Sequence, residues 1–155
     1  MQMPEQDISR KLKNGKRMLS VAESCTGGLL SSRITDIPGS SAYYLGGIIA
    51  YSNRVKISVL KVPESLIKTH GAVSRQVARA MARGARSLLN TDISAAITGI
   101  AGPGGARPGK PVGTAFMAVL SGDTERTRKI HCKGTREQVK QKFATAVLEL
   151  ISENI

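Results

Sequence analysis

The chain has 155 residues, of which 41% are hydrophobic and 22% charged, and this composition is typical of one soluble globular domain. No apolar run approaches the roughly 20 residues that span a bilayer, and the polar first 14 residues lack the apolar core of a secretory signal. The two cysteines, Cys25 and Cys132, match neither a metal-ligand spacing nor a disulfide framework. We therefore expect a cytoplasmic domain without membrane segment, metal or structural disulfide.

The formal net charge of +12 leaves two explanations open. One is a basic face that binds nucleic acid, and the other is a basic surface around a site for an anionic substrate. Aromatic residues make up only 3% of the chain, so few rings can stack on bases, and no nucleic-acid-binding motif is present. The basic residues are spread along the chain, which favours a solvated basic surface over nucleic-acid binding.

In chain order, the sequence first predicts a helix, a strand and a second helix. Residues 1–15 form a leader whose apolar positions have helical spacing, and Gly15 is expected to end that helix. The apolar run 18–22 is typical of a strand. Thr26 is a suitable N-cap for a helix over 27–35.

The middle of the chain predicts a strand over 43–52, two short helices and one long helix. Two adjacent glycines inside the strand, Gly46 and Gly47, indicate a bulge or a close backbone approach. The short helices are expected over 53–60 and from Pro63 to Gly71. Ser74 can cap the long helix, 73–89, whose apolar face would comprise Val77, Ala80, Met81, Ala85, Leu88 and Leu89.

The last third predicts three strands, one long loop and a final helix. Residues 93–98 are apolar in succession, which is typical of a strand buried on both faces, and the Gly- and Pro-rich stretch 99–113 is irregular. Strands over 114–120 and 126–131 would form a hairpin. A capping box of Thr135 and Gln138 opens a helix whose apolar face would be Val139, Phe143, Val147, Leu150 and Ile151. Together these elements predict one α/β domain over 1–155, with helices on both faces of a mixed, mostly parallel sheet.

The turn at residues 24–28 carries the first chemical signal. A serine between a strand and a helix, Ser24, can be a nucleophile if a base lies near, and flanking amides can form an oxyanion hole. The local sequence alone favours a plain helix cap, but Gly27 and Gly28 would let a ligand approach the backbone. Cys25 is a rival nucleophile without a neighbouring histidine in the sequence.

The second signal is the run Thr98-Gly-Ile-Ala-Gly-Pro-Gly-Gly105. It follows a buried strand, where α/β proteins place ligand loops, and glycine-rich loops present N–H groups to phosphate or carboxylate. The run is neither GxGxxG nor a P-loop, so it does not indicate a dinucleotide or ATP. An irregular loop of about fifteen residues in a compact domain is usually functional.

Two basic residues lie where they could act on a ligand. Lys56 follows a strand end and could be a base if it were desolvated, although a surface lysine is the plainer interpretation. Arg136 begins the last helix and could either hold a phosphate or face solvent. The two histidines, His70 and His131, lie in no motif, so a Ser-His-Asp triad is not expected.

Taken together, these segments resemble the CinA C-terminal domain family, the nicotinamide-nucleotide amidases. The matching segments occur in order over roughly residues 16–150 and comprise 22–30, 38–41, 51–53 with Lys56, 71–74, 98–105 and 110–114. In two-domain relatives this module follows a larger N-terminal domain. Only a short leader precedes it here, so we expect the stand-alone form.

The resemblance implies a three-layer α/β/α sandwich, commonly dimeric, that converts nicotinamide mononucleotide to nicotinic acid mononucleotide and ammonia in pyridine nucleotide salvage. It implies no metal or other cofactor, and a small nucleotide substrate rather than nucleic acid. The catalytic residues would be Ser24 as nucleophile, Lys56 as its base, and Thr98. The substrate-binding residues would be Cys25, Thr26, Gly27, Gly28, Tyr51, Asn53, Gly102, Gly104, Gly105 and Arg136.

The sequence departs from the family pattern in two places. Arg75 stands where relatives often carry an acidic residue, and the loop contains Arg107 in Gly-Gly-Ala-Arg-Pro-Gly-Lys where Thr-Pro-Glu-Lys is commoner. Arg107 could strengthen phosphate binding or face solvent. Both departures bear on substrate preference more than on reaction class. Two alternatives stay open, a non-catalytic nucleotide sensor and a nucleic-acid-associated module.

Overall fold

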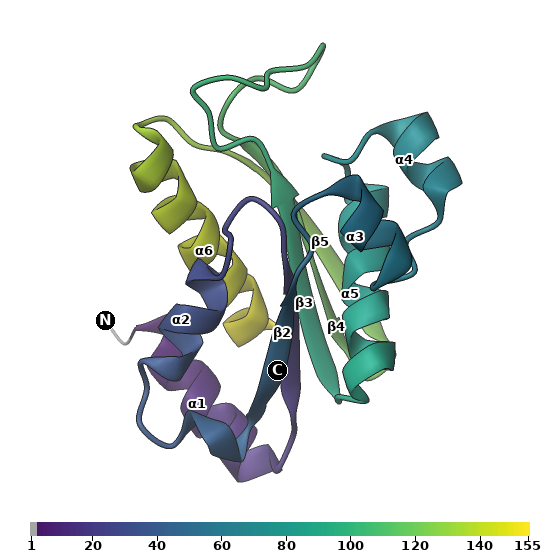
Figure 1. Ribbon diagram of the computed structural model, residues 1–155. Coiled ribbons are helices and arrows are strands. Elements are labelled where there is room, and N and C mark those ends of the chain that lie inside the picture. The colour runs from purple at the N-terminus through teal and green to yellow at the C-terminus, as the bar shows by residue number, and fades with distance from the viewer. Residues whose placement is uncertain (1–2) are drawn as a thin grey trace.

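The computed structural model describes residues 3–155, which form a five-stranded sheet with helices on both faces (Figure 1). The strand order is β2-β1-β3-β4-β5. The strands are β1 (Leu19–Glu23), β2 (Tyr44–Ile49), β3 (Ile93–Gly99), β4 (Thr114–Ser121) and β5 (Thr124–His131). The α-helices are α1 (Pro4–Gly15), α2 (Leu29–Thr35), α3 (Asn53–Ser58), α4 (Glu64–His70), α5 (Arg75–Leu89) and α6 (Arg136–Glu153). A 3-10 turn, Ser40–Ala42, precedes β2.

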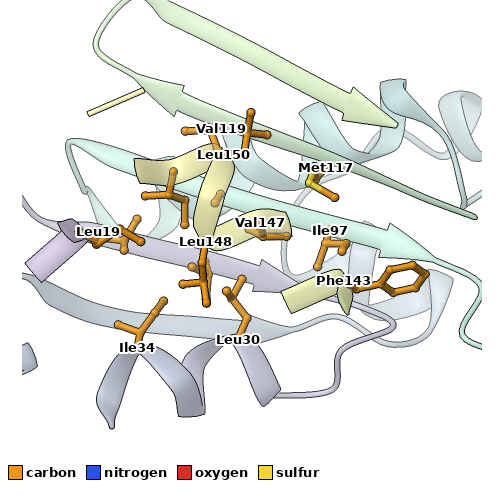
Figure 2. Close-up of a cluster of buried hydrophobic side chains, with 14 of the residues drawn as sticks. Leu19, Leu30, Ile34, Ile97, Met117, Val119, Phe143, Val147, Leu148 and Leu150 are labelled. Carbon is orange, nitrogen blue, oxygen red and sulfur yellow. The ribbon is translucent and has the colours of Figure 1, made fainter. Parts of the chain in front are cut away.

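Two hydrophobic cores lie on opposite faces of the sheet and make the protein three-layered. Helices α1, α2 and α6 cover one face, where Phe143 and Val147 of α6 pack with Ile97 and Met117 of the sheet (Figure 2). Helix α5 covers the other face with small side chains such as Ala78 and Ala82. Successive strand residues point to opposite faces, so β1, β3 and β4, which are buried along almost their whole length, supply apolar side chains to both cores.

The α/β class and the three-layer arrangement are confirmed, but the prediction of a mostly parallel sheet is wrong. β1 pairs in parallel with β2 and β3, whereas β3–β4 and β4–β5 are antiparallel ladders, and these two are the longer ones. A parallel strand needs a crossover element to return the chain. The segment between β3 and β4 contains no helix, so β4 returns antiparallel, and a tight turn then leads into β5.

Most local signals for the elements are confirmed. Ser74 caps α5 by accepting the Val77 N–H, and Thr135 and Gln138 form the capping box of α6. The register of β2 against β1 shifts at Leu45, which is the expected bulge. A side chain at Gly47 would lie within 2.9 Å of atoms of Val21, Ser31 and Tyr44, which is the expected close approach.

The predicted apolar face of α5 is wrong at three of its six positions, since Ala80, Leu88 and Leu89 are not among the buried residues of the helix. Its buried stripe is Val77, Ala78, Met81, Ala82 and Ala85, so Ala80 lies outside it at helical spacing. Leu88, in the last turn, is 54% exposed, because the buried residues of the helix end at Ala85. By contrast, all five residues predicted for the apolar face of α6 are buried.

The parallel part of the sheet prepares the functional site. Strands β1, β2 and β3 run in the same direction, so their carboxyl ends meet at one edge of the sheet. The turn after Glu23, the segment 50–56 and the long loop 100–113 all leave the sheet at that edge (Figure 1). Within residues 3–155, no helix is both long and apolar enough to cross a membrane.

Candidate active site

The turn between β1 and α2 is organised by Glu23, a fully buried carboxylate at the end of the strand. One oxygen accepts from Thr26 Oγ1 at 2.6 Å and from the N–H groups of Gly28 and Leu30, at 3.2 and 2.8 Å. The other accepts from the N–H and hydroxyl of Ser31, at 3.0 and 2.6 Å. Glu23 therefore satisfies the open N–H groups at the start of α2, as a helix cap would.

This arrangement corrects the prediction that Thr26 caps a helix beginning at Gly27. Helix α2 begins at Leu29, its N-cap position is Gly28 at φ 107°, and the Thr26 hydroxyl donates to Glu23 instead. The positive φ angles of Gly27 (59°) and Gly28 (107°) turn the chain so that the amides of α2 reach the carboxylate. A buried acid ending an apolar strand, just before a glycine pair, was the signal available in the sequence.

Ser24 and Lys56 are in contact. The Lys56 ammonium donates to Ser24 Oγ at 2.9 Å and to the carbonyl oxygens of Ala50 and Tyr51 at 2.9 and 3.0 Å. Lys56 is only 2% exposed, and burial lowers its pKa below the ordinary value. The parallel pairing of β1 with β2 produces this contact between residues 32 positions apart, because Ser24 follows β1 and Lys56 follows β2.

Cys25 lies beside Ser24 but in a different electrostatic state. Burial raises the pKa of its thiol to about 12, so the thiol stays protonated at neutral pH. Neither cysteine forms a disulfide. Of the two adjacent candidate nucleophiles, only Ser24 contacts a potential base.

These residues line a cavity of about 730 Å³ at the edge of the sheet. All three predicted catalytic residues lie in its wall, as do most of the predicted binding residues. The latter are Cys25, Tyr51, Asn53, Gly102, Gly104, Gly105 and Arg136. Thr26, Gly27 and Gly28 lie outside it, since they serve the turn around Glu23. No three His, Cys, Asp or Glu side chains gather into a potential metal site within residues 3–155.

Thr98 and Arg136 fix the walls of the cavity. The Thr98 hydroxyl, which is nearly fully buried, donates to the Ala72 carbonyl at 2.9 Å and so joins β3 to the segment before α5. Arg136 donates from Nη1 to the Gly102 carbonyl at 2.5 Å and from Nη2 to Tyr51 Oη at 3.3 Å. Arg136 thereby links the glycine-rich loop to the segment after β2.

The backbone of the nucleophile turn leaves two N–H groups open. The N–H of Ser24 donates to the Ile97 carbonyl, that of Gly27 to the Ser24 carbonyl, and that of Gly28 to Glu23. Within the described part of the chain, the N–H groups of Cys25 and Thr26 donate to no other residue. Of these two residues only Cys25 lines the cavity, so its N–H is the donor that could receive developing negative charge next to Ser24.

Sequence comparison identifies the family of the whole chain. Residues 1–155 match the model of the CinA C-terminal domain. This chain belongs to that family. The resemblance inferred from the sequence motifs is thus confirmed, and the cavity just described is the cavity of a CinA C-terminal domain.

Several proteins are similar to this CinA domain. It is 51% identical over 137 residues to a CinA-like protein of Geotalea daltonii, an alignment that covers 88% of this chain and 33% of that protein. It is 45% identical over 150 residues to a CinA-like protein of Mycobacterium tuberculosis, with 96% and 35% covered. The chain therefore spans about a third of the length of these relatives.

Solved structures of the family share the fold. Competence damage-inducible protein A from Klebsiella pneumoniae superposes with a TM-score of 0.94 at 31% identity, covering 97% of this chain and 94% of that chain. The competence/damage inducible protein CihA from Agrobacterium tumefaciens gives a TM-score of 0.91 at 34% identity, with the same coverage. The α/β architecture of this CinA domain is thus the one found in these family members.

Proposed function

We propose that this CinA domain is an amidase that hydrolyses the carboxamide of nicotinamide mononucleotide to nicotinic acid mononucleotide and ammonia. The observation that carries the proposal is the 2.9 Å contact between Lys56 Nζ and Ser24 Oγ in the wall of a ligand-sized cavity. A nucleophile within hydrogen-bond reach of a base is the signature of covalent catalysis. The choice of substrate follows from the family resemblance and is supported by the basic residues around the cavity.

Lys56 is the general base in this mechanism. As a neutral amine it donates its two N–H groups to the carbonyls of Ala50 and Tyr51, and its lone pair accepts the Ser24 hydroxyl proton. The same three contacts surround Nζ in the structure, and the lowered pKa of Lys56 increases the fraction of neutral amine at a given pH. No histidine is required between nucleophile and base.

The reaction then proceeds through an acyl-enzyme. Ser24 Oγ attacks the carboxamide carbon while Lys56 takes its proton, and the resulting ammonium gives that proton to the departing nitrogen, which leaves as ammonia. Lys56 next deprotonates a water, which attacks the ester carbon. The Lys56 ammonium then returns the proton to Ser24 Oγ as the ester bond breaks, which releases the carboxylic acid and restores the serine hydroxyl. The pyridinium ring withdraws electrons from the carboxamide, which makes the first attack easier.

The open N–H group of Cys25, a residue of the cavity wall, stabilises the negative oxygen of the tetrahedral intermediates. Each good donor of this kind contributes about 3–4 kcal/mol in comparable sites. Arg136 binds the 5′-phosphate, since its guanidinium is already oriented by the Gly102 carbonyl and Tyr51 and keeps further N–H donors. Binding of the phosphate orients the carboxamide toward Ser24.

The protonated state of Cys25 supports the serine over the cysteine as nucleophile. A thiol whose pKa is raised to about 12 provides almost no thiolate near neutral pH. Cys25→Ser is therefore expected to retain most of the activity.

The test is to incubate the purified chain with nicotinamide mononucleotide and to quantify ammonia and nicotinic acid mononucleotide. We expect equimolar products from the wild type and from Ser87→Ala, a matched control at an exposed serine on α5, and none from Ser24→Ala. Binding of the mononucleotide without ammonia release would identify a non-catalytic nucleotide sensor instead. Full turnover by Ser24→Ala would refute the serine mechanism.

A further inference from the structure

The wall of the active-site cavity carries basic side chains and no carboxylate. Its basic residues are Lys56, Arg107, Lys110 and Arg136, and none of the lining residues is Asp or Glu. Lys56 is buried against Ser24, so the remaining three set the charge of the rest of the wall. A concave wall of one charge sign concentrates ligands of the opposite sign.

Two of these three cations are already bound to the protein. Lys110 Nζ donates to the His70 carbonyl at 2.6 Å, and Arg136 donates to the Gly102 carbonyl and Tyr51. These contacts hold the glycine-rich loop at both ends. The guanidinium of Arg107 has no partner among residues 3–155, and Arg107 is exposed at the cavity wall.

The backbone of Arg107 is nevertheless fixed. Arg107 and Lys110 exchange two hydrogen bonds, of 2.9 and 2.8 Å, across the turn formed by Pro108 and Gly109. This pairing places two like charges opposite each other, which is unfavourable unless an anion lies between or beside them. The loop therefore holds an unpartnered guanidinium at the cavity without a protein carboxylate to neutralise it.

We propose that Arg107 is a second phosphate-binding residue of this site and acts with Arg136 on the phosphate monoester of the substrate. The planar guanidinium can donate two parallel hydrogen bonds to phosphate oxygens, and two guanidiniums balance the charge of a phosphate dianion. Arg136 is oriented beforehand by its protein contacts, whereas Arg107 closes on the phosphate from the loop. The inference rests on the proposed function only for the identity of the nucleotide.

The test measures binding without turnover, by calorimetry on the Ser24→Ala protein. The two probes are nicotinamide mononucleotide and nicotinamide riboside, which differ only in the phosphate. Adding Arg107→Gln should weaken mononucleotide binding by roughly ten- to a hundredfold, the range for a charged hydrogen-bonding group. The preference for the mononucleotide over the riboside should fall by the same factor. Arg126→Gln, at an exposed arginine of β5 away from the cavity wall, is the matched control.

Three outcomes would overturn the inference: unchanged mononucleotide affinity in Arg107→Gln, equal weakening of both ligands, or no mononucleotide binding to the Ser24→Ala protein. Equal weakening would show that Arg107 shapes the loop rather than contacting phosphate. The product assay judges the amidase separately, because binding here requires no chemistry. If the mononucleotide binds through Arg107 but the wild type does not hydrolyse it, the proposed amidase activity is refuted, whereas the phosphate-binding role of Arg107 is supported.

Discussion

Glu23 and Lys56 are both buried ionisable residues, but they differ in the number and kind of their hydrogen-bond partners. The Glu23 carboxylate accepts from three backbone N–H groups and two hydroxyls, and these five hydrogen bonds compensate the cost of burying its charge. Lys56 has two carbonyls and one hydroxyl around it and no carboxylate partner. The acid therefore serves the shape of the nucleophile turn, whereas the amine is free to act as a base.

Replacing Glu23 by Gln should loosen that turn. The amide nitrogen of Gln would replace one of the two carboxylate oxygens and would face N–H donors. At least one charged hydrogen bond is then lost, and one N–H group of the turn points at another donor instead of an acceptor. We expect the free energy of unfolding to fall by about 2–4 kcal/mol in urea titrations. Glu149→Gln, at an exposed glutamate of α6, should change it by less than about 0.5 kcal/mol. Equal stability of the two variants would show that Glu23 does not hold the turn.

The lowered pKa of Lys56 predicts a pH-dependent difference between the wild type and Lys56→Met. Between the folded-state pKa and the ordinary value of 10.5, the unfolded chain holds a proton on Lys56 that the folded chain has lost. The stability of the wild type relative to the variant should therefore rise with pH in this window, by at most about 1.4 kcal/mol per pH unit. Unfolding free energies of both proteins, measured across alkaline pH, check this slope. A difference that is flat or falls would contradict the burial argument.

At the scale of elements, the sequence predicted what local chemistry decides. The caps at Ser74 and Thr135, the bulge next to the paired glycines and the apolar face of α6 each depend on a few neighbouring residues. Whether β4 runs parallel or antiparallel to β3 did not follow from such signals, because the sequence of the loop 99–113 is compatible with both arrangements. The stripe of α5 was misplaced because the sheet and neighbouring segments determine which side of the helix is buried.

The site was predictable only in part for the same reason. The motifs identified Ser24, Lys56 and the glycine-rich loop, but their partnership came from the family resemblance, since no spacing links residues 24 and 56. The role of Glu23 was missed because it requires the tertiary path of the turn through Gly28. Lys110 and Ala72 were missed because their contacts with His70 and Thr98 join distant segments.

Gly84 shows how one residue sets the fit between α5 and its neighbours. An added Cβ there would lie 2.1 Å from the Leu60 carbonyl oxygen. Gly84→Ala, which would ordinarily stabilise a helix by about 1 kcal/mol, should here lower the free energy of unfolding by about 1–3 kcal/mol. Thermal or urea unfolding against Ser87→Ala, an exposed substitution in the same helix, provides the comparison. A higher free energy of unfolding for Gly84→Ala would contradict this, because it would mean that α5 can shift away from Leu60 without losing stability.

At the scale of the whole molecule, 23 lysines and arginines outnumber 11 aspartates and glutamates, which leaves a net charge of +12 even though some of the acids form ion pairs. Glu125 pairs with both Arg79 and Arg83, and Glu5 pairs with Arg33 at 2.5 Å. The cavity wall has no acidic residue, so the excess positive charge extends to the site. This pattern suits an anionic ligand that approaches the carboxyl edge of the sheet.

This charge predicts a salt dependence of the reaction. Added potassium chloride should lower kcat/KM for nicotinamide mononucleotide, because screening weakens the attraction of its phosphate. Nicotinamide riboside, which carries no phosphate, should show a weaker or opposite dependence. Initial rates of ammonia release at increasing ionic strength measure both. Identical salt dependence for the two substrates would contradict an electrostatic role of the cavity wall.

The central claim is that Ser24 and Lys56 act as one catalytic unit, and the most direct test is ammonia release by Ser24→Ala, Lys56→Met and the double variant. Each single variant should lose roughly a thousandfold or more in kcat, and the double variant should lose no more than either one. Wild-type turnover in either single variant, or losses that multiply in the double variant, would contradict the account.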